Sequence, residues 1–271
     1  MSVTQHYSAI FISDTHLGTR GCQADKLAAF LKSHTCDQLF LVGDIIDGWR
    51  LKSGFYWPQQ HNNVLRRILT MAKRGTEVIY VTGNHDEFLR KYSPMEFGNL
   101  TFVDRVEHVA RDGKRFLVVH GDEFDAITRY HRWVAFLGDI GYTMLLHANT
   151  HLNTVRRRLG YGYWSLSAWI KHRVKKAVNF ISEFEGAIAY QCRKDGFDGV
   201  ICGHIHHAEV TEIEGVQYMN CGDWVESCTA LVENSAGQFE IIYWTNTAEQ
   251  PTADILPIDP STNEAELKKT A

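Results

Sequence analysis

Five short apolar runs in this chain each end in residues that can bind a metal ion or carry a proton. The run at residues 39–42 leads directly into Gly43-Asp44, so a carboxylate stands where a buried strand would end. The other four runs lead into Ser13-Asp14-Thr15-His16, Gly83-Asn84-His85-Asp86, His120-Gly121-Asp122 and Gly203-His204-Ile205-His206. Open α/β sheets bind their ligands outside the carboxyl ends of the strands. The pattern therefore predicts an α/β fold whose strand ends build one site.

The segments around these runs predict the elements that carry them. Strands are expected at residues 8–13, 39–42, 78–82, 116–119 and 199–202. Leu27, Phe30 and Leu31 recur at helical spacing after the first strand, and residues 60–74 carry a longer helical stripe that ends at Gly75. This alternation of strands and helices indicates βαβ units with parallel strands.

The C-terminal part of the chain predicts further strands. Residues 217–220, 230–233 and 239–244 are typical of antiparallel strands joined by polar turns, and we expect them to build a second sheet against the first. The chain is polar from Thr245 onward and contains three prolines, so residues 249–271 are expected to form a loosely ordered tail.

Residues 123–186 interrupt the strand pattern with helical periodicity, which predicts a helical cap inserted into a core of residues 1–122 and 187–248. Between Asp139 and Glu183 there is no acidic residue. The stretch nevertheless holds seven basic residues: Arg156, Arg157, Arg158, Lys171, Arg173, Lys175 and Lys176. Two interpretations explain this basic run equally well: it recognises an anionic substrate, or it is a solvated helix face. An anionic lipid surface is a further possible partner of the basic residues.

Composition excludes several classes of protein. The formal net charge of -4 argues against a generally basic nucleic-acid binder. The six cysteines form no C-x-x-C pair, which favours reduced thiols and a cytoplasmic location. We find neither a signal peptide at the N-terminus nor an apolar run of about 18 residues that could span a bilayer. The chain is expected to be a cytoplasmic enzyme of undetermined oligomeric state.

The five groups, taken in order, resemble the motifs of the calcineurin-like metallophosphoesterases. The resemblance implies a two-sheet metallophosphoesterase sandwich flanked by helices, with two divalent metal ions at the strand ends. One ion would be held by Asp14, His16, Asp44 and His206, and the other by Asp44, Asn84, His120 and His204, so that Asp44 bridges them. His85 would contact the phosphate and assist the leaving group, oriented by Asp86. The mixed carboxylate, amide and imidazole ligands favour manganese, with iron or zinc as alternatives.

Within this superfamily the chain more narrowly resembles the UDP-2,3-diacylglucosamine diphosphatases of lipid A synthesis. The similarity rests on Ser13-Asp14-Thr15-His16-Leu17, Gly43-Asp44 followed by Trp49, His120-Gly121-Asp122, the cap, and Gly222-Asp223-Trp224. It implies a pyrophosphatase that uses metal-activated water on a phosphorylated, lipid-linked nucleotide. Those enzymes carry Arg where this chain has His85, and Glu where it has Asp47. A nucleotide phosphodiesterase or nuclease on the same core and a non-catalytic metal-binding scaffold remain alternatives.

Several polar residues near the motifs have simpler explanations. We interpret His34, His61 and His108 as hydrogen-bonded residues of the fold, and His207 as an orienting or surface residue. Asp47 is either a turn residue or a support for the ligands, and Asp122 has the same two interpretations.

Overall fold

The computed structural model describes residues 5–124, 181 and 184–244. The predicted cap lies almost wholly outside these residues. The seven basic residues at positions 156–158, 171, 173, 175 and 176 and the predicted tail lie entirely outside them. No helix in the described part of the chain is long and apolar enough to cross a membrane.

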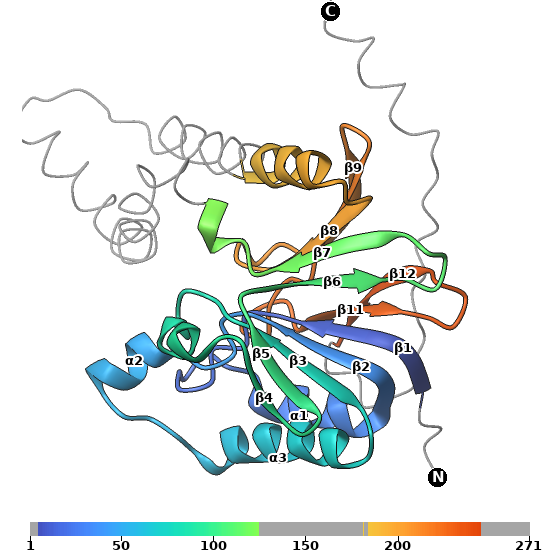
Figure 1. Ribbon diagram of the computed structural model, residues 1–271. Helices are drawn as coiled ribbons and strands as arrows, with labels where there is room; N and C mark the ends of the chain where they lie inside the picture. The colour runs from blue at the N-terminus through green and yellow to red at the C-terminus, as the bar shows by residue number, and fades with distance from the viewer. Residues whose placement is uncertain (1–4, 125–180, 182–183, 245–271) are drawn as a thin grey trace, which may run out of the picture.

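Two sheets carry the fold (Figure 1). The first has the strand order β12-β11-β1-β2-β3-β5-β4, and the second has the order β6-β7-β8-β10-β9. The strands are β1 (Gln5–Ile12), β2 (His34–Val42), β3 (Glu77–Val81), β4 (Met95–Phe97), β5 (Leu100–Val103), β6 (Arg105–Val109), β7 (Arg115–Val119), β8 (Gly199–Cys202), β9 (Glu209–Ile213), β10 (Val216–Asn220), β11 (Thr229–Glu233) and β12 (Phe239–Tyr243).

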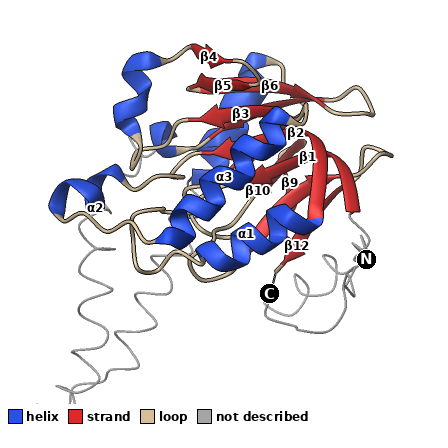
Figure 2. Cartoon of the chain, turned by 90° about the horizontal axis from the view of Figure 1, so that it is seen from below, coloured by secondary structure: helices blue, strands red, loops and turns tan. Residues whose placement is uncertain are grey.

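Helices lie on the outer face of each sheet, and short helices lie in the loops that follow the strands (Figure 1). They are α1 (Ala24–Ser33), α2 (Gly48–Ser53) and α3 (Gln59–Lys73), with short 3-10 helices η1 (Glu87–Tyr92) and η2 (Asp122–Phe124). Figure 2 shows α1 and α3 side by side against the first sheet. A further helix, residues 184–195, packs on the second sheet through Phe184 and Ile188. The predicted α/β sandwich flanked by helices is therefore confirmed.

Alternation of side chains along the strands builds three apolar layers. Ile10 and Ile12 of β1 face α1 and α3, whereas Phe11 points between the sheets and stacks on Phe40 of β2 with ring centroids 4.6 Å apart. Both faces of the strand are buried, which explains why the sequence shows unbroken apolar runs. On α1, Leu27, Phe30 and Leu31 form the expected stripe toward this sheet.

The prediction that three C-terminal strands build the second sheet is wrong for two of them. β10 does belong to the second sheet and runs parallel to β8, but β11 pairs antiparallel with β1 and is followed by β12 in the first sheet. β11 is buried along its whole length: Ala230 and Val232 face the α1 side, and Leu231 faces the second sheet. A strand that is apolar on both faces suits the interior of a large sheet.

Candidate metal centre

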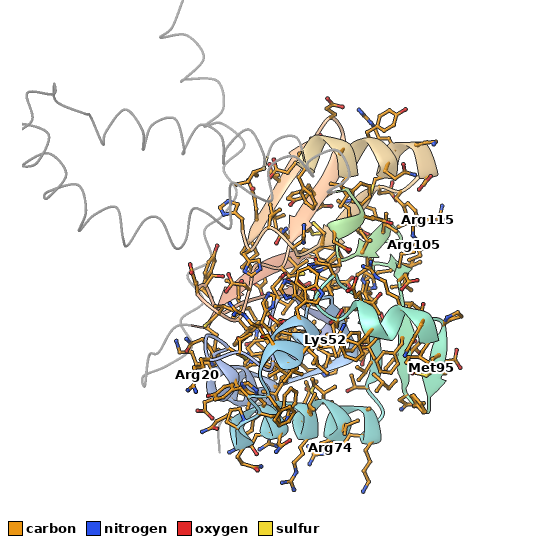
Figure 3. All side chains as sticks on the ribbon, turned by 90° about the vertical axis from the view of Figure 1, so that its left-hand side faces the viewer. Arg20, Lys52, Arg74, Met95, Arg105 and Arg115 are labelled. Atoms are coloured by element: carbon orange, nitrogen blue, oxygen red, sulfur yellow. The ribbon has the colours of Figure 1, made fainter. Side chains whose placement is uncertain are left out.

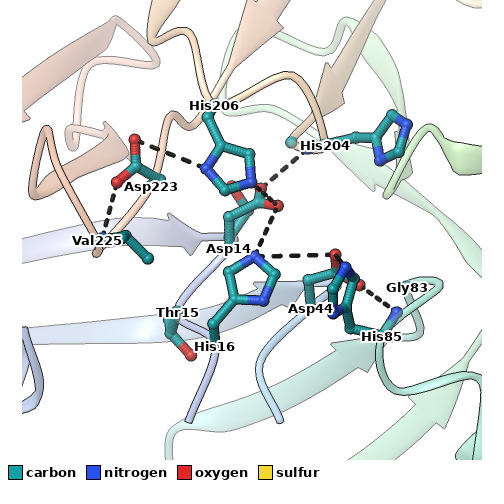
Figure 4. A network of polar contacts seen from close by, with 12 residues as sticks. Asp14, Thr15, His16, Asp44, Gly83, His85, His204, His206, Asp223 and Val225 are labelled. Atoms are coloured by element: carbon teal, nitrogen blue, oxygen red, sulfur yellow. Dashed lines mark hydrogen bonds and ion pairs between the residues drawn. The ribbon is translucent and has the colours of Figure 1, made fainter. Parts of the chain in front are cut away.

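The five predicted groups meet where the two sheets end. Asp14, Asp44 and Asn84 follow β1, β2 and β3 of the first sheet. His120 follows β7 of the second sheet, and His204 and His206 follow β8. Backbone hydrogen bonds tie the loops together, since Asp14 N donates to Gly43 O at 3.1 Å and Gly203 N donates to His120 O at 3.1 Å. Both sheets therefore contribute to one cluster (Figure 4).

The backbone of the cluster is strained. Asp14, His16, Asp44, His204 and His206 all have positive φ, between 48° and 72°, a region that residues other than glycine seldom occupy. Such strain persists where surrounding contacts enforce it, and it concentrates at functional sites. These turns aim the side chains into the space between the loops.

Asp44 lies at the centre of the donor atoms. Its Oδ2 is 3.4 Å from Nε2 of His120, 3.9 Å from Nε2 of His85 and 4.0 Å from Nε2 of His16. Asp14 Oδ1 lies 3.2 Å from Nε2 of His206 and 3.9 Å from Nε2 of His16. Asp14, His16 and His206 form one group whose donor atoms lie within 4.8 Å of one another, and Asp14, Asp44 and His120 form another.

Three buried atoms of the predicted ligands make no hydrogen bond to any described residue: Asp14 Oδ1, Asn84 Oδ1 and His120 Nε2. His120 Nδ1 contacts the carbonyl oxygen of Val42 at 3.0 Å, which leaves Nε2 free to face Asp44. Buried polar atoms are rarely left without partners. Oxygen and imidazole atoms that make no hydrogen bond to the described residues and converge in this way fit divalent metal ions.

Electrostatics also favour bound cations. Burial alone would raise the pKa of Asp44, but the nearby His120 lowers it to about 2. Burial alone would lower the pKa of His120, but the Asp44 and Asp14 carboxylates raise it to about 10. In the same way Asp14 overcomes the burial of His206 and raises its pKa to about 9. Two buried carboxylates thus attract positive charge strongly, which metal ions would supply.

His85 lies at the rim of the cluster. Its amide nitrogen donates to Asp44 Oδ1 at 2.8 Å, and its side chain is one-quarter exposed. The ring of Trp49 lies over the imidazole, with centroids 4.2 Å apart. Burial lowers the pKa of His85, but the contacts with Asp47 and Asp44 outweigh it and raise the pKa above its ordinary value. A partly exposed imidazole with a raised pKa, beside the cluster, is suited to meet a bound phosphate.

The prediction that Asp86 orients His85 is wrong. Asp86 Oδ2 accepts hydrogen bonds from Ile45 N at 2.9 Å and from the Tyr80 hydroxyl at 2.6 Å, and its Oδ1 accepts from Gly83 N. These bonds fasten the loops after β2 and β3 to each other, and they leave Asp86 turned away from the imidazole. Its role is therefore to position the loops.

Asp47 takes the place predicted for Asp86. Its Oδ2 lies 3.0 Å from Nδ1 of His85 and 3.3 Å from Nδ1 of His16, and its Oδ1 accepts from Arg50 N at the start of α2. The carboxylate therefore orients two histidines of the site, and of the two interpretations of Asp47 the support for the ligands is the one the structure favours. The sequence signal was its position three residues after Asp44.

The remaining histidines differ in their surroundings. The ring of His204 lies 5.1 Å from that of His120, and its amide donates to Asp14 Oδ2 at 2.9 Å, although His204 belongs to none of the compact donor groups. His108 is buried against Glu233 at 2.9 Å, as expected for a residue of the fold, and His207 is exposed.

Two acids outside the predicted ligand set also have defined places. Asp122 pairs with Arg90, both carboxylate oxygens lying 2.8 Å from the same guanidinium nitrogen, so it serves the fold. Asp223 is buried, and its Oδ2 lies 4.0 Å from Nδ1 of His206. Asp223 was not predicted as a site residue, although Gly222-Asp223-Trp224 stood out in the sequence.

Comparisons with known proteins agree with this geometry. The sequence profile of the calcineurin-like phosphoesterases matches residues 7–208. UDP-2,3-diacylglucosamine hydrolase of Porphyromonas gingivalis is 29% identical over 150 residues, which cover 52% of this chain and 56% of the relative. The enzyme of the same name from Tolumonas auensis is 27% identical over 132 residues, covering 45% and 52%. The chain thus spans about half the length of these two relatives.

A third relative is matched over more of its length. UDP-2,3-diacylglucosamine hydrolase of Neisseria meningitidis serogroup B is 26% identical over 227 residues, which cover 80% of this chain and 89% of the relative. Among solved structures, an archaeal phosphodiesterase is matched over 87% of this chain and 98% of its own at 14% identity, with a TM-score of 0.40. That likeness is too distant to bear on function.

Proposed function

The chain belongs to the calcineurin-like phosphoesterase family, and we propose that it is a dinuclear-metal pyrophosphatase of the UDP-2,3-diacylglucosamine hydrolase type. Membership makes it a metal-dependent hydrolase of phosphate esters or anhydrides. The relatives' shared name supports an anhydride between a nucleotide and a lipid-bearing sugar as the substrate. A substrate of this kind would meet the enzyme in the cytoplasm, at the inner face of a membrane.

The observation that carries the proposal is the central position of Asp44. Its Oδ2 lies 4.0 Å from Nε2 of His16 and 3.4 Å from Nε2 of His120, so one carboxylate is suited to serve two ions. We assign one ion to Asp14, His16, Asp44 and His206, and the other to Asp44, Asn84, His120 and His204. Ions held there would polarise the phosphoryl group and activate a water for attack at phosphorus.

The chain's own residues would contribute orientation and a proton. His85 is placed to donate from Nε2 to the oxygen of the leaving group, because its Nδ1 faces the Asp47 carboxylate at 3.0 Å. The same carboxylate contacts Nδ1 of His16, which leaves Nε2 of that ring facing Asp14 and Asp44, where it would bind an ion. The departing nucleotide or sugar phosphate would leave with a proton that His85 supplies, provided that the ring is protonated at the start.

The test is hydrolysis by the purified, metal-loaded protein. Incubation with UDP-2,3-diacylglucosamine should release UMP and the acylated sugar phosphate in equal amounts, with a much higher kcat/KM than for bis(p-nitrophenyl) phosphate. Efficient cleavage of the diester together with failure to cleave the anhydride would instead identify a phosphodiesterase. Absence of turnover on both substrates, with two ions bound, would support the non-catalytic scaffold.

From the sequence alone, we also propose that the basic residues of the cap recognise the substrate's phosphates. The basic run supports this because Arg binds phosphate oxygens through two donors. Replacing Arg156, Arg157 and Arg158 by Gln should raise KM for the anhydride much more than for the aryl diester. Equal changes for both substrates would contradict recognition, and binding of the unaltered protein to anionic vesicles would point to a lipid surface instead.

A further inference from the structure

A cavity of about 410 Å³ lies where α1 and α3 begin. Small-molecule sites typically occupy cavities of about 300 to 1,000 Å³. Thr19 of its wall connects the cavity to the metal centre, because the Thr19 amide and hydroxyl donate to the carbonyl oxygen of His16 at 3.1 Å and 2.9 Å. The cavity therefore begins one turn of chain away from a predicted metal ligand, and none of the roles assigned above uses it.

Both helices present open first turns to this cavity. The N-cap residues are Gln23 for α1 and Pro58 for α3, and neither side chain caps its helix. Both residues line the cavity. The first N–H groups of a helix have no partner within the helix, and their dipoles attract anions. Two such helix starts on one cavity make an environment that favours negative charge.

His61 offers a hydrogen-bond donor to the cavity. It lines the cavity and is only 2% exposed, and its Nδ1 accepts a hydrogen bond from Gly18 N at 3.1 Å. The neutral ring therefore carries its proton on Nε2. No acceptor in the described part of the chain hydrogen-bonds to that N–H. Burial lowers the pKa of His61, which keeps the ring neutral. This N–H is therefore available to an acceptor from a ligand or from solvent in the cavity.

The side chains around the cavity add charge and an aromatic surface. Arg20 and Lys26 are cationic and Asp25 is anionic, so these three side chains together carry a net positive charge. The guanidinium of Arg20 lies 4.6 Å from the centroid of the Tyr56 ring. Figure 3 shows Arg20 at the edge of the described chain, where solvent reaches it. A cation with a fixed orientation on an aromatic ring is well placed to pair with phosphate oxygens.

We propose that this cavity is a binding site for a phosphate-bearing small molecule, with His61 Nε2, Arg20, Lys26 and the two helix starts as its donors. The phosphate belongs either to the part of the substrate beyond the cleaved bond or to a separate phosphate ligand. The existence of the site does not depend on the proposed function, whereas the first of these two sources rests on it.

Nuclear magnetic resonance of the zinc-loaded protein tests the site directly. Inorganic phosphate and UMP are titrated separately while the imidazole ¹⁵N signals of His61, assigned through its backbone, are followed. A saturable shift of the Nε2 signal is expected with at least one of the two probes. A signal that stays unchanged with both probes, or drifts without saturation, would overturn the proposal.

Charge variants distinguish this cavity from the metal centre. Lys26→Gln should weaken binding about tenfold, the loss typical of one charge-assisted hydrogen bond, whereas Asp25→Asn should strengthen it. Lys32→Gln is the matched control, because Lys32 is exposed in the last turn of the same helix. Equal affinities of Lys26→Gln and Lys32→Gln would overturn the proposal.

The source of the phosphate follows from steady-state kinetics of the same pair. If the substrate itself reaches the cavity, KM for a nucleoside diphosphate sugar rises in Lys26→Gln relative to Lys32→Gln. If KM is equal in the two variants while phosphate affinity differs, the ligand is a free phosphate compound. Both kinetic outcomes presuppose that the cavity binds phosphate, and the titrations with inorganic phosphate and UMP decide whether it does.

Discussion

Replacement of Asp47 by Asn separates the role of its charge from its role in the fold. Asn caps a helix as well as Asp does, so the hydrogen bond from Arg50 N at the start of α2 is kept. The negative charge beside Nδ1 of His16 and Nδ1 of His85 is lost. Loss of a carboxylate that orients a ligand typically costs about 10- to 100-fold in activity or metal affinity. We therefore expect kcat to fall by that factor, which equals about 1.4 to 2.8 kcal/mol.

The assay combines turnover of an aryl phosphodiester, metal content and urea unfolding of the same preparations. Asp195→Asn serves as the control, because Asp195 is exposed and its carboxylate accepts a hydrogen bond from Gln191 on the same helix. The free energy of unfolding of the metal-free Asp195→Asn control should stay within about 0.5 kcal/mol of wild type, as for other surface substitutions. That of Asp47→Asn should fall by about 1 kcal/mol, the contribution of a typical hydrogen bond, because Asp47 is buried beside two histidines. Wild-type kcat in Asp47→Asn would refute the reasoning, and a large loss of stability would show that Asp47 acts mainly in the fold.

Three further predictions follow from the contacts described above. His85→Ala should keep two ions while kcat falls about 10²- to 10⁴-fold, and metal loss measured by elemental analysis would make His85 a ligand instead. Gly203→Ala would bring a methyl carbon within 2.5 Å of Asp14 Oδ2, so the melting temperature of this variant should drop by the equivalent of about 1 to 3 kcal/mol. Gly54→Ala is the control, because Gly54 has open space around it, and equal melting temperatures of the two variants would contradict the close packing. Burial lowers the pKa of His34 below 6.5. The unfolded chain therefore binds the proton more readily, and the free energy of unfolding decreases as the pH falls below about 6.5. Urea titrations should find a smaller decrease in His34→Gln than in the wild-type protein, and an identical decrease would mean that His34 does not contribute.

The predicted ligands could be located from the sequence because each one follows an apolar run. Asp14, Asp44 and His120 stand directly after the runs that became β1, β2 and β7, and the carboxyl ends of parallel strands gather at one edge. The number of strands between those positions did not matter for this inference. The cluster was therefore predictable without knowing how the sheets are divided.

The division into sheets was not predictable in the same way. β10 and β11 both show short apolar runs, yet β10 pairs with β8 and β11 pairs with β1. An apolar run records that a strand is buried, but the partner is decided by packing between distant parts of the chain.

The carboxylate that orients His85 was also not predicted correctly from the sequence. Asp86 follows His85 directly and was therefore predicted to orient it, but in the loop after β3 its carboxylate faces Ile45 N and the Tyr80 hydroxyl. Asp47 reaches the imidazole from another loop. Neighbours in sequence point in different directions in a tight loop, so the structure was needed to decide which of the two carboxylates orients the imidazole.

The most direct test of the account is the metal content of the wild-type protein and of Asp44→Asn. Elemental analysis after reconstitution with manganese, iron or zinc and extensive dialysis should find two ions per wild-type chain. The Asp44→Asn chain should lose both ions together with its activity, because a single carboxylate is assigned to both, while Asp195→Asn keeps both. Two tightly retained ions in Asp44→Asn, or a single ion in the wild-type protein, would contradict the dinuclear centre.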